Sequence, residues 1–391
     1  MFQLDFICDN FGFESKIVIN RHQLAFAKER LFKGKALIIY GPRQAGKTTF
    51  TELLLKETNE KILRLNGDDA DTRSVLSEAN STLLQNIIGN HKILVIDEDQ
   101  RIPNIGIAIK IIVDQFKDVQ VIATGSSSFE LANHINEPLT GRKYELLLLP
   151  IAFQEMVAHT DYLNETRMLE QRLVFGSYPE IITDPSRAEK HIKLLANSYL
   201  YKDLYLLEQI KNPILLEKLV KALALQVGSE ISVNELSKLI GADNKTIEKY
   251  ISALEQAFVV FTLTAFSKNV RNELKKSRKI YFYDNGVINA ITGNFNAIQQ
   301  RTDVGALWES YLISERLKFK AINQMNASSH FWRTTQQQEI DYIEFSSTSM
   351  AAYEFKWSAK ANYKFPVTFS KAYPSATLQT IHPKNYGSFL S

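Results

Sequence analysis

The chain has 391 residues, of which 45% are hydrophobic and 23% are charged, and its formal net charge is +3. This composition excludes a disordered chain and favours two or three globular domains, and the small net charge means that nucleic-acid binding would have to come from local basic patches. The single cysteine, Cys8, excludes an internal disulfide framework and a cysteine-rich zinc site.

The first residues, MFQLDFICDNFGF, include Asp5 and Asp9 and lack a basic region, so we expect no secretory signal. Apolar runs such as LLLLPIAF are far too short to span a membrane. We therefore expect a cytoplasmic protein with no membrane partner.

The segment LIIYGPRQAGKTTFTELLL, residues 37 to 55, matches G-x-x-x-x-G-K-[ST] between a buried-strand pattern and a helical one. Glycines let the backbone N–H groups of such a loop point inward, and the lysine reaches the terminal phosphates. A simple strand-to-helix turn is the alternative, but the flanking patterns favour nucleotide binding. We predict an ATP or ADP site built from Gly41, Pro42, Arg43, Gln44, Ala45, Gly46, Lys47, Thr48 and Thr49, with Thr48 also supplying a hydroxyl for Mg²⁺.

Residues 92–103, KILVIDEDQRIP, predict an apolar strand that ends in carboxylates. Asp97 is the candidate on the metal side of the site, and Glu98 could polarise an attacking water, which favours hydrolysis over binding alone. A third strand, VQVIATGSSS, ends in serines, where the Ser126 hydroxyl could sense the γ-phosphate or hold the water. A polar strand-to-helix turn is the alternative for that serine.

The motifs GPRQAGKTT, VIDEDQRIP, ATGSSSFEL and LTGRKYELLLLPIAFQE resemble the ATPase domain of AAA-type prokaryotic proteins that carry a C-terminal domain of unknown function. The resemblance continues through FGSYPEII (175–182), YLYKDLYLLEQI and YFYDNGVINAI, and so covers nearly the whole chain. It implies that Arg142 is a phosphate-facing arginine. An ordinary surface arginine is the alternative, since such a residue must be placed in space.

Residues 231–256 predict a helix-turn-helix, with a Gly241 break and an Asn244 cap between two amphipathic helices. The β-rich FVVFTLTAF, the basic SKNVRNELKKSRK and IYFYDNG then predict the hairpin of a winged helix. The basic residues of this hairpin would contact DNA phosphates: Lys268, Arg271, Lys275, Lys276, Arg278 and Lys279. A solvated loop or a protein-docking module is the alternative, because the second helix carries Glu248 and Glu255.

The last hundred residues contain a helical Glu309, Asp341 early in a strand, and Glu354 and Lys356 on one face of the strand AAYEFKWS. This set resembles the PD-(D/E)XK nuclease fold. The resemblance implies that Asp341 and Glu354 ligate Mg²⁺, Glu309 completes the metal shell and Lys356 orients the attacking water. An ordinary edge strand with alternating polar and aromatic residues is the alternative.

The predicted fold class is α/β. A P-loop AAA-type ATPase domain occupies residues 1–155, a helical connector 156–226, a winged-helix module 227–298 and a restriction-endonuclease-like α/β domain 299–391. Two functional hypotheses follow: an ATP-hydrolysing, DNA-associated enzyme whose terminal domain cuts DNA, or a nucleotide-switched DNA- or protein-binding module with an inert terminal platform. A protein partner and an oligomeric state are left open.

Overall fold

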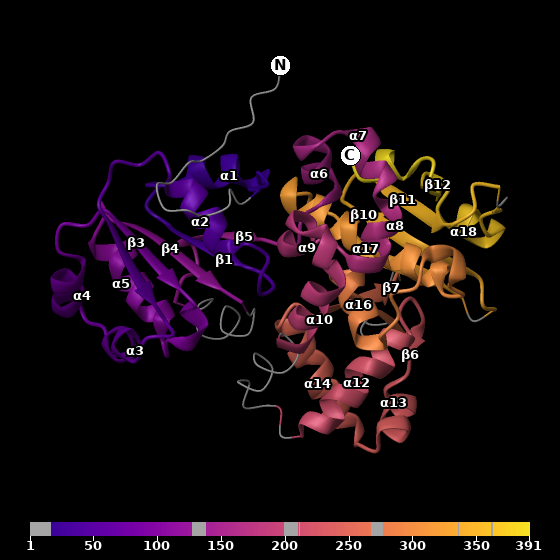
Figure 1. The fold of residues 1–391 in the computed structure, drawn as a ribbon, viewed down its shortest axis with the longest axis horizontal. Helices are drawn as coiled ribbons and strands as arrows, with labels where there is room; N and C mark the ends of the chain where they lie inside the picture. Colours follow the sequence, from indigo (N-terminus) through magenta and orange to yellow (C-terminus); the bar gives the residue numbers. More distant parts are fainter. Residues whose placement is uncertain are drawn as a thin grey trace.

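The structure, a computed structural model, describes residues 17–126, 138–198, 210, 212–266, 277–334, 336–360 and 363–391. Figure 1 shows two bodies side by side, an indigo-to-purple first body (residues 17–152) and a second body that contains the rest of the chain.

A parallel sheet with helices on both faces forms the first body. Its strand order is β2-β3-β4-β1-β5, and every neighbouring pair is parallel. The strands are β1 (Ala36–Tyr40), β2 (Ile62–Asn66), β3 (Ile93–Asp97), β4 (Gln120–Gly125) and β5 (Lys143–Leu147). The helices are α1 (Gln23–Arg30), α2 (Lys47–Leu55), α3 (Ala70–Ser77), α4 (Ser81–Ile88) and α5 (Ile105–Gln115), and Asp99–Arg101 form a 3-10 turn.

The strand β1 shows why this sheet is covered on both sides. Leu37 and Ile39 pack with α1 and α2, whereas Ile38 joins the core under α3, α4 and α5. Successive side chains of a strand point to opposite faces, so a continuous apolar run such as ALIIY requires helices on both. The α/β P-loop domain expected from the sequence is therefore present.

Helices come first in the second body: α6 (Phe153–His159), α7 (Tyr162–Arg167), α8 (Leu169–Phe175), α9 (Pro179–Thr183), α10 (Ala188–Ser198) and α12 (Pro213–Leu225), with a 3-10 turn at Pro185–Arg187. There follow β6 (Glu230–Ile231), α13 (Val233–Ile240), α14 (Asn244–Gln256), β7 (Val260–Ala265), β8 (Arg278–Phe282) and α16 (Asn285–Thr292). The last elements are α17 (Val304–Ile322), β9 (Ser328–Arg333), β10 (Glu339–Phe345), β11 (Met350–Phe355), α18 (Val367–Ala372) and β12 (Thr377–Ile381), with 3-10 turns at Ile298–Gln300 and Tyr386–Phe389.

The two helices expected between residues 231 and 256 are α13 and α14. Gly241 ends α13 in the left-handed conformation, with φ of 79°, as a helix C-terminus favours. The cap of α14 differs from the prediction: the Asp243 side chain, one residue before Asn244, accepts from Thr246 N. Aspartate is as good an N-cap as asparagine, so the two candidates could not be separated by residue type.

One mixed sheet runs through the second body, in the order β12-β11-β10-β9-β7-β8-β6. The join is a parallel pairing of β7 with β9, in which Thr264 lies opposite His330. The sheet therefore crosses the expected boundary between residues 298 and 299, and that boundary does not separate two sheets.

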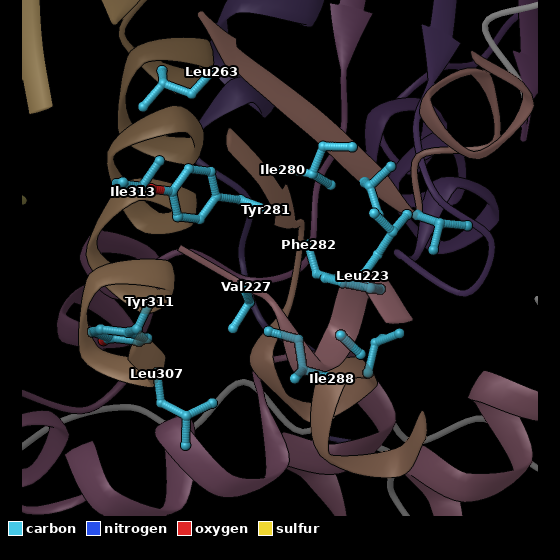
Figure 2. Close-up of a cluster of buried hydrophobic side chains, with 14 of the residues drawn as sticks. Leu223, Val227, Leu263, Ile280, Tyr281, Phe282, Ile288, Leu307, Tyr311 and Ile313 are labelled. Carbon is cyan, nitrogen blue, oxygen red and sulfur yellow. The ribbon is translucent and has the colours of Figure 1, made fainter. Parts of the chain in front are cut away.

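One large hydrophobic core packs against this sheet and also includes the helices of the expected connector, while a smaller cluster joins the terminal strands to Phe369 of α18. Figure 2 shows side chains of α12, β7, β8, α16 and α17 packed together, among them Leu223, Phe282, Ile288 and Tyr311. Residues 153 to 390 contribute to this core. The connector, the helix-turn-helix region and the terminal strands thus depend on one another for burial.

Asp284 is the buried cap at the start of α16. Its carboxylate accepts from Gly286 N at 2.8 Å and from Ser177 N at 2.7 Å. Asp284 is only 3% exposed. Burial raises the pKa of Asp284, while the nearby Lys318 ammonium and these backbone N–H groups lower it. The carboxylate thus joins α16 to the loop between α8 and α9.

We predict that Asp284→Ala lowers the free energy of unfolding by about 3 kcal/mol, because two buried N–H groups are left without an acceptor and the buried Lys318 ammonium loses one of its two nearby carboxylates and keeps only Glu315. Urea denaturation measures the effect. Asp243→Ala is the matched control, since removal of that exposed cap should destabilise the protein much less. Equal destabilisation of the two variants would contradict the role given to burial.

Candidate nucleotide site and the terminal carboxylate cluster

The loop after β1 has the backbone shape of a phosphate cradle. Gly41 has φ of +148°, and a Cβ there would lie 2.1 Å from Leu148 O. Gly46 has φ of +91° and precedes the first residue of α2. Both positions therefore require glycine, which is the physical reason for the two glycines of the motif.

Lys47 lies at the mouth of this loop. It is 8% exposed, and its Nζ donates to Gly41 O and to Pro42 O, both at 2.9 Å. These bonds keep the ammonium over the loop, where N–H groups and the N-terminus of α2 favour anions. Thr48 follows on the first turn of α2, and Lys47 and Thr48 both line a cavity that is described below.

Asp97 is the last residue of β3 and Glu98 follows it, at the same edge of the sheet as the P-loop. The Asp97 carboxylate accepts from the Thr124 hydroxyl of β4 and, at 3.1 Å, from Glu98 N. Glu98 has a left-handed backbone with φ of 51°. Both acidic residues line the cavity with Lys47 and Thr48, and a hydroxyl with a carboxylate is a donor set that suits Mg²⁺.

Gln100 is a residue that the sequence prediction missed. Its Nε2 donates to the Glu98 carboxylate and, at 3.0 Å, to Ser126 Oγ, and its Oε1 accepts from Ser126 N at 3.2 Å. Gln100 therefore holds the candidate base and the candidate serine in one network. The sequence signal that could have identified Gln100 is its position, as a neutral polar residue two positions after Glu98.

Arg142 does not lie at this site, which corrects the role implied by the resemblance. Strand β5 begins at Lys143, which is opposite Ala36, and the P-loop follows Tyr40 at the other end of β1. A strand of that length separates the two positions by roughly 16 Å. Arg142 instead pairs with Asp114 of α5, Nε to Oδ1 at 2.7 Å, and this hydrogen bond lowers the pKa of Asp114.

A cavity of about 870 Å³ lies between the P-loop and the second body. The first body supplies the loop, Asp97 and Glu98, and the second body supplies residues of α9, the 3-10 turn and α10: Pro179, Glu180, Thr183, Asp184, Arg187 and His191. Hydrogen bonds from Ser186 and His191, together with the Arg187 guanidinium, lower the pKa of Asp184 to about 2. The wall opposite the P-loop therefore carries its own charged network.

The strand order, the glycine loop, Lys47 and the Asp97–Glu98 pair together define a P-loop nucleotide-binding domain. Residues 33–157 match a family model described as an AAA domain. The first body is therefore a P-loop ATPase domain of the AAA class.

Residues 166–297 and 304–386 match two family models, each described as a domain of unknown function (DUF8612 and DUF4143). An uncharacterised protein of Mycobacterium tuberculosis is 25% identical over 336 residues, which cover 84% of this chain and 72% of that protein. An uncharacterised protein of Methanocaldococcus jannaschii is 27% identical over 283 residues, which cover 67% and 63% respectively. Among solved structures, the Walker-type ATPase of Pyrococcus abyssi aligns with a TM-score of 0.48 and 14% identity, over 70% of this chain and 96% of that chain.

The predicted nuclease residues lie near one another, at the terminal strands β10 and β11 and on the helix α17. Asp341 is on β10 and Glu354 on β11, which are antiparallel neighbours, and Asp341 Oδ2 accepts from Phe355 N at 2.8 Å. Glu309 lies on α17, and Lys356 Nζ donates to Glu354 Oε1 at 2.6 Å.

These carboxylates are not arranged as a metal site. Among the residues that the structure describes, no group of three or more acidic, histidine or cysteine side chains could hold a metal ion. The Mg²⁺ roles of Glu309, Asp341 and Glu354 stay a prediction. Lys279 lies beside these residues, with its Nζ 3.0 Å from Glu309 Oε1.

The burial of Lys279 also corrects its predicted role as a DNA-contacting residue of the basic hairpin. Lys279 is 2% exposed, and Arg278 pairs with Glu248 of α14 at 2.6 Å. The other basic residues of the hairpin, Lys268, Arg271, Lys275 and Lys276, lie outside the described residues.

Within the described parts of the chain, no helix is both long and apolar enough to cross a membrane.

Proposed function

We propose that the protein binds ATP with Mg²⁺ between its two bodies, hydrolyses it, and uses the nucleotide state to control a DNA-associated second body. The observation that carries this proposal is the shared cavity, in which the P-loop and the α9–α10 wall face the same space. A ligand that contacts both walls binds one relative arrangement better than others, and so shifts the populations of those arrangements.

The proposed roles follow from the positions of the side chains. Lys47 and the loop N–H groups would hold the β- and γ-phosphates, and Thr48 with Asp97 would hold the ion, which when bound would neutralise phosphate charge. Glu98 would take a proton from the attacking water, and Gln100 would orient that carboxylate and Ser126. Arg142 is not part of this proposal for a single chain.

We predict that Glu98→Gln lowers the ATP hydrolysis rate by about 10²–10⁴-fold, because the amide keeps the shape of the side chain but cannot accept the proton. ATP affinity should change little, since the base acts in the transition state. Steady-state hydrolysis and fluorescent-nucleotide titration measure the two quantities.

The control for this variant is Glu52→Gln, which removes an exposed carboxylate of α2 and should leave both quantities unchanged. Full turnover in the Glu98 variant would assign the base to another residue, and an equal reduction of affinity would assign Glu98 to binding.

DNA is the proposed partner because of the elements around the hairpin. Helices α13 and α14 precede β7 and β8, and β8 pairs with both β7 and β6, an order that supports a winged-helix module. Between the two long strands the sequence carries Lys268, Arg271, Lys275 and Lys276 against Glu273. Such a cluster suits phosphate contacts that carry no sequence information.

We predict that replacing these four basic residues with glutamine weakens binding to a short DNA duplex and reduces its salt dependence by roughly 0.9 units of slope for each phosphate that the protein no longer neutralises. Titrations at several salt concentrations measure both effects. A variant with four exposed lysines of the first body replaced, Lys56, Lys61, Lys110 and Lys117, carries the same charge change and should bind normally. Equal effects in the two variants would indicate attraction by overall charge alone.

A protein-docking module is the second candidate. The Glu248 carboxylate of α14 pairs with Arg278, so the second helix presents acidic charge beside the hairpin, which is unfavourable in a DNA groove. DNA binding that survives replacement of the four basic residues would favour this candidate. Cleavage by the terminal sheet is not part of the proposed function, because the described acidic residues are not arranged to hold a metal ion.

A further inference from the structure

Lys279 lies where three elements of the second body meet. It comes from β8, and its Nζ contacts Glu309 Oε1 of α17 at 3.0 Å and Glu339 Oε1 of β10 at 2.6 Å. The lysine side chain is 2% exposed, and the two carboxylate side chains are 15% and 29% exposed. A buried ammonium between two carboxylates is stabilised only while both partners stay in place.

The surrounding groups complete an acidic cluster. The Tyr281 hydroxyl donates to Glu309 Oε1 at 2.5 Å, and Glu354, 4% exposed, accepts from Lys356. Burial raises the pKa of Asp341, and so do the charges of Glu309 and Glu354, whereas Lys279 lowers it. The negative charges of Glu309, Glu339 and Asp341 thus act on Lys279 from α17 and β10.

We infer that the Lys279 ammonium is the resident cation of the cluster formed by Glu309, Glu339, Asp341 and Glu354, and that it fills the place a divalent metal ion would take. The cluster is therefore closed to Mg²⁺ and Mn²⁺. Hard divalent cations prefer carboxylate oxygens, and an ammonium at 2.6 and 3.0 Å from two of these carboxylates supplies the positive charge in their stead.

This arrangement also joins β8 to the terminal strands. Lys279 lies three residues after Lys276, the last basic residue of the segment between β7 and β8. Its ion pairs tie the base of that segment to α17 and β10. The cluster thus has a structural role and not a catalytic one: its ion pairs connect the proposed DNA-binding hairpin to the terminal strands.

Mn²⁺ binding tests the inference, with free Mn²⁺ counted by electron paramagnetic resonance on the nucleotide-free full chain. Wild type and Asp341→Asn should bind Mn²⁺ identically. Lys279→Met should gain one Mn²⁺ site that wild type and Asp341→Asn both lack. Its affinity should be at least roughly tenfold higher than any Mn²⁺ binding by this cluster in those two proteins. The double variant Lys279→Met, Asp341→Asn should lack that site. Sites at the P-loop are common to all of these proteins and cancel.

Lys318→Met is the matched control, because Lys318 is also buried and pairs with Glu315 at 2.6 Å, and it should gain no site. Wild-type Mn²⁺ binding that falls in Asp341→Asn would overturn the inference, as would a folded Lys279→Met that binds no more Mn²⁺ than wild type. If Lys279→Met folds only when Mn²⁺ is present, the inference is supported. If it stays unfolded with Mn²⁺, the inference fails.

Discussion

Arg21 makes the contact on which the rest of this structure depends. Its guanidinium donates to Ala45 O of the P-loop at 2.9 Å, to Leu149 O at 2.7 Å, and to Glu155 Oε1 of α6 at 2.9 Å. Glu155 is fully buried and also accepts from His22 N and Ala152 N. Removal of the arginine would leave a buried carboxylate without its counter-ion, which is far more costly than removal of a surface pair. The phosphate loop and the first helix of the second body are therefore positioned by one side chain.

A second connection reaches the P-loop from the opposite side of the cavity. The segment FGSYPEII, whose role the sequence did not reveal, holds Ser177 between Asp284 and Lys318. Two residues later, Pro179 Cγ lies 3.7 Å from the position of a Cβ on Gly46. A change in the loop on phosphate binding would thus meet α9 directly, and α9 is tied through Ser177 to α16 and α17. This geometry gives the nucleotide a physical route to the second body.

The parts that could be predicted from the sequence are those set by local spacing. Gly41, Lys47 and Asp97 follow directly from a loop and a strand end, because parallel strands gather their carboxyl ends at one sheet edge. Arg142 precedes its strand, so the same rule places it at the opposite edge, and the implied role conflicts with that rule. Gln100 reaches Ser126 across 26 residues and Arg21 reaches Glu155 across 134 residues, and the local sequence around Gln100 and Arg21 does not indicate these distant partners.

Lys279 shows a different limit of prediction from the sequence. It stands in a basic run, yet by the two-residue period of a strand it shares a face with Tyr281, which is fully buried. The alternation could have indicated an inward lysine. What the sequence could not show was the parallel pairing of β7 with β9, which places β8 in the same sheet as the terminal strands, with β7 between them, and so brings the lysine to the carboxylates.

Coupling between the two bodies requires that ATP contact both walls of the cavity. Hydrogen exchange of the Glu98→Gln protein, with and without ATP and Mg²⁺, tests this requirement, because amide protection reports local opening in each wall separately. We expect ATP to slow exchange in residues 41–49 and also in residues 179–191, while α13 is unchanged. Protection confined to residues 41–49 would contradict the proposed coupling, since the nucleotide would then bind the first body without engaging the second.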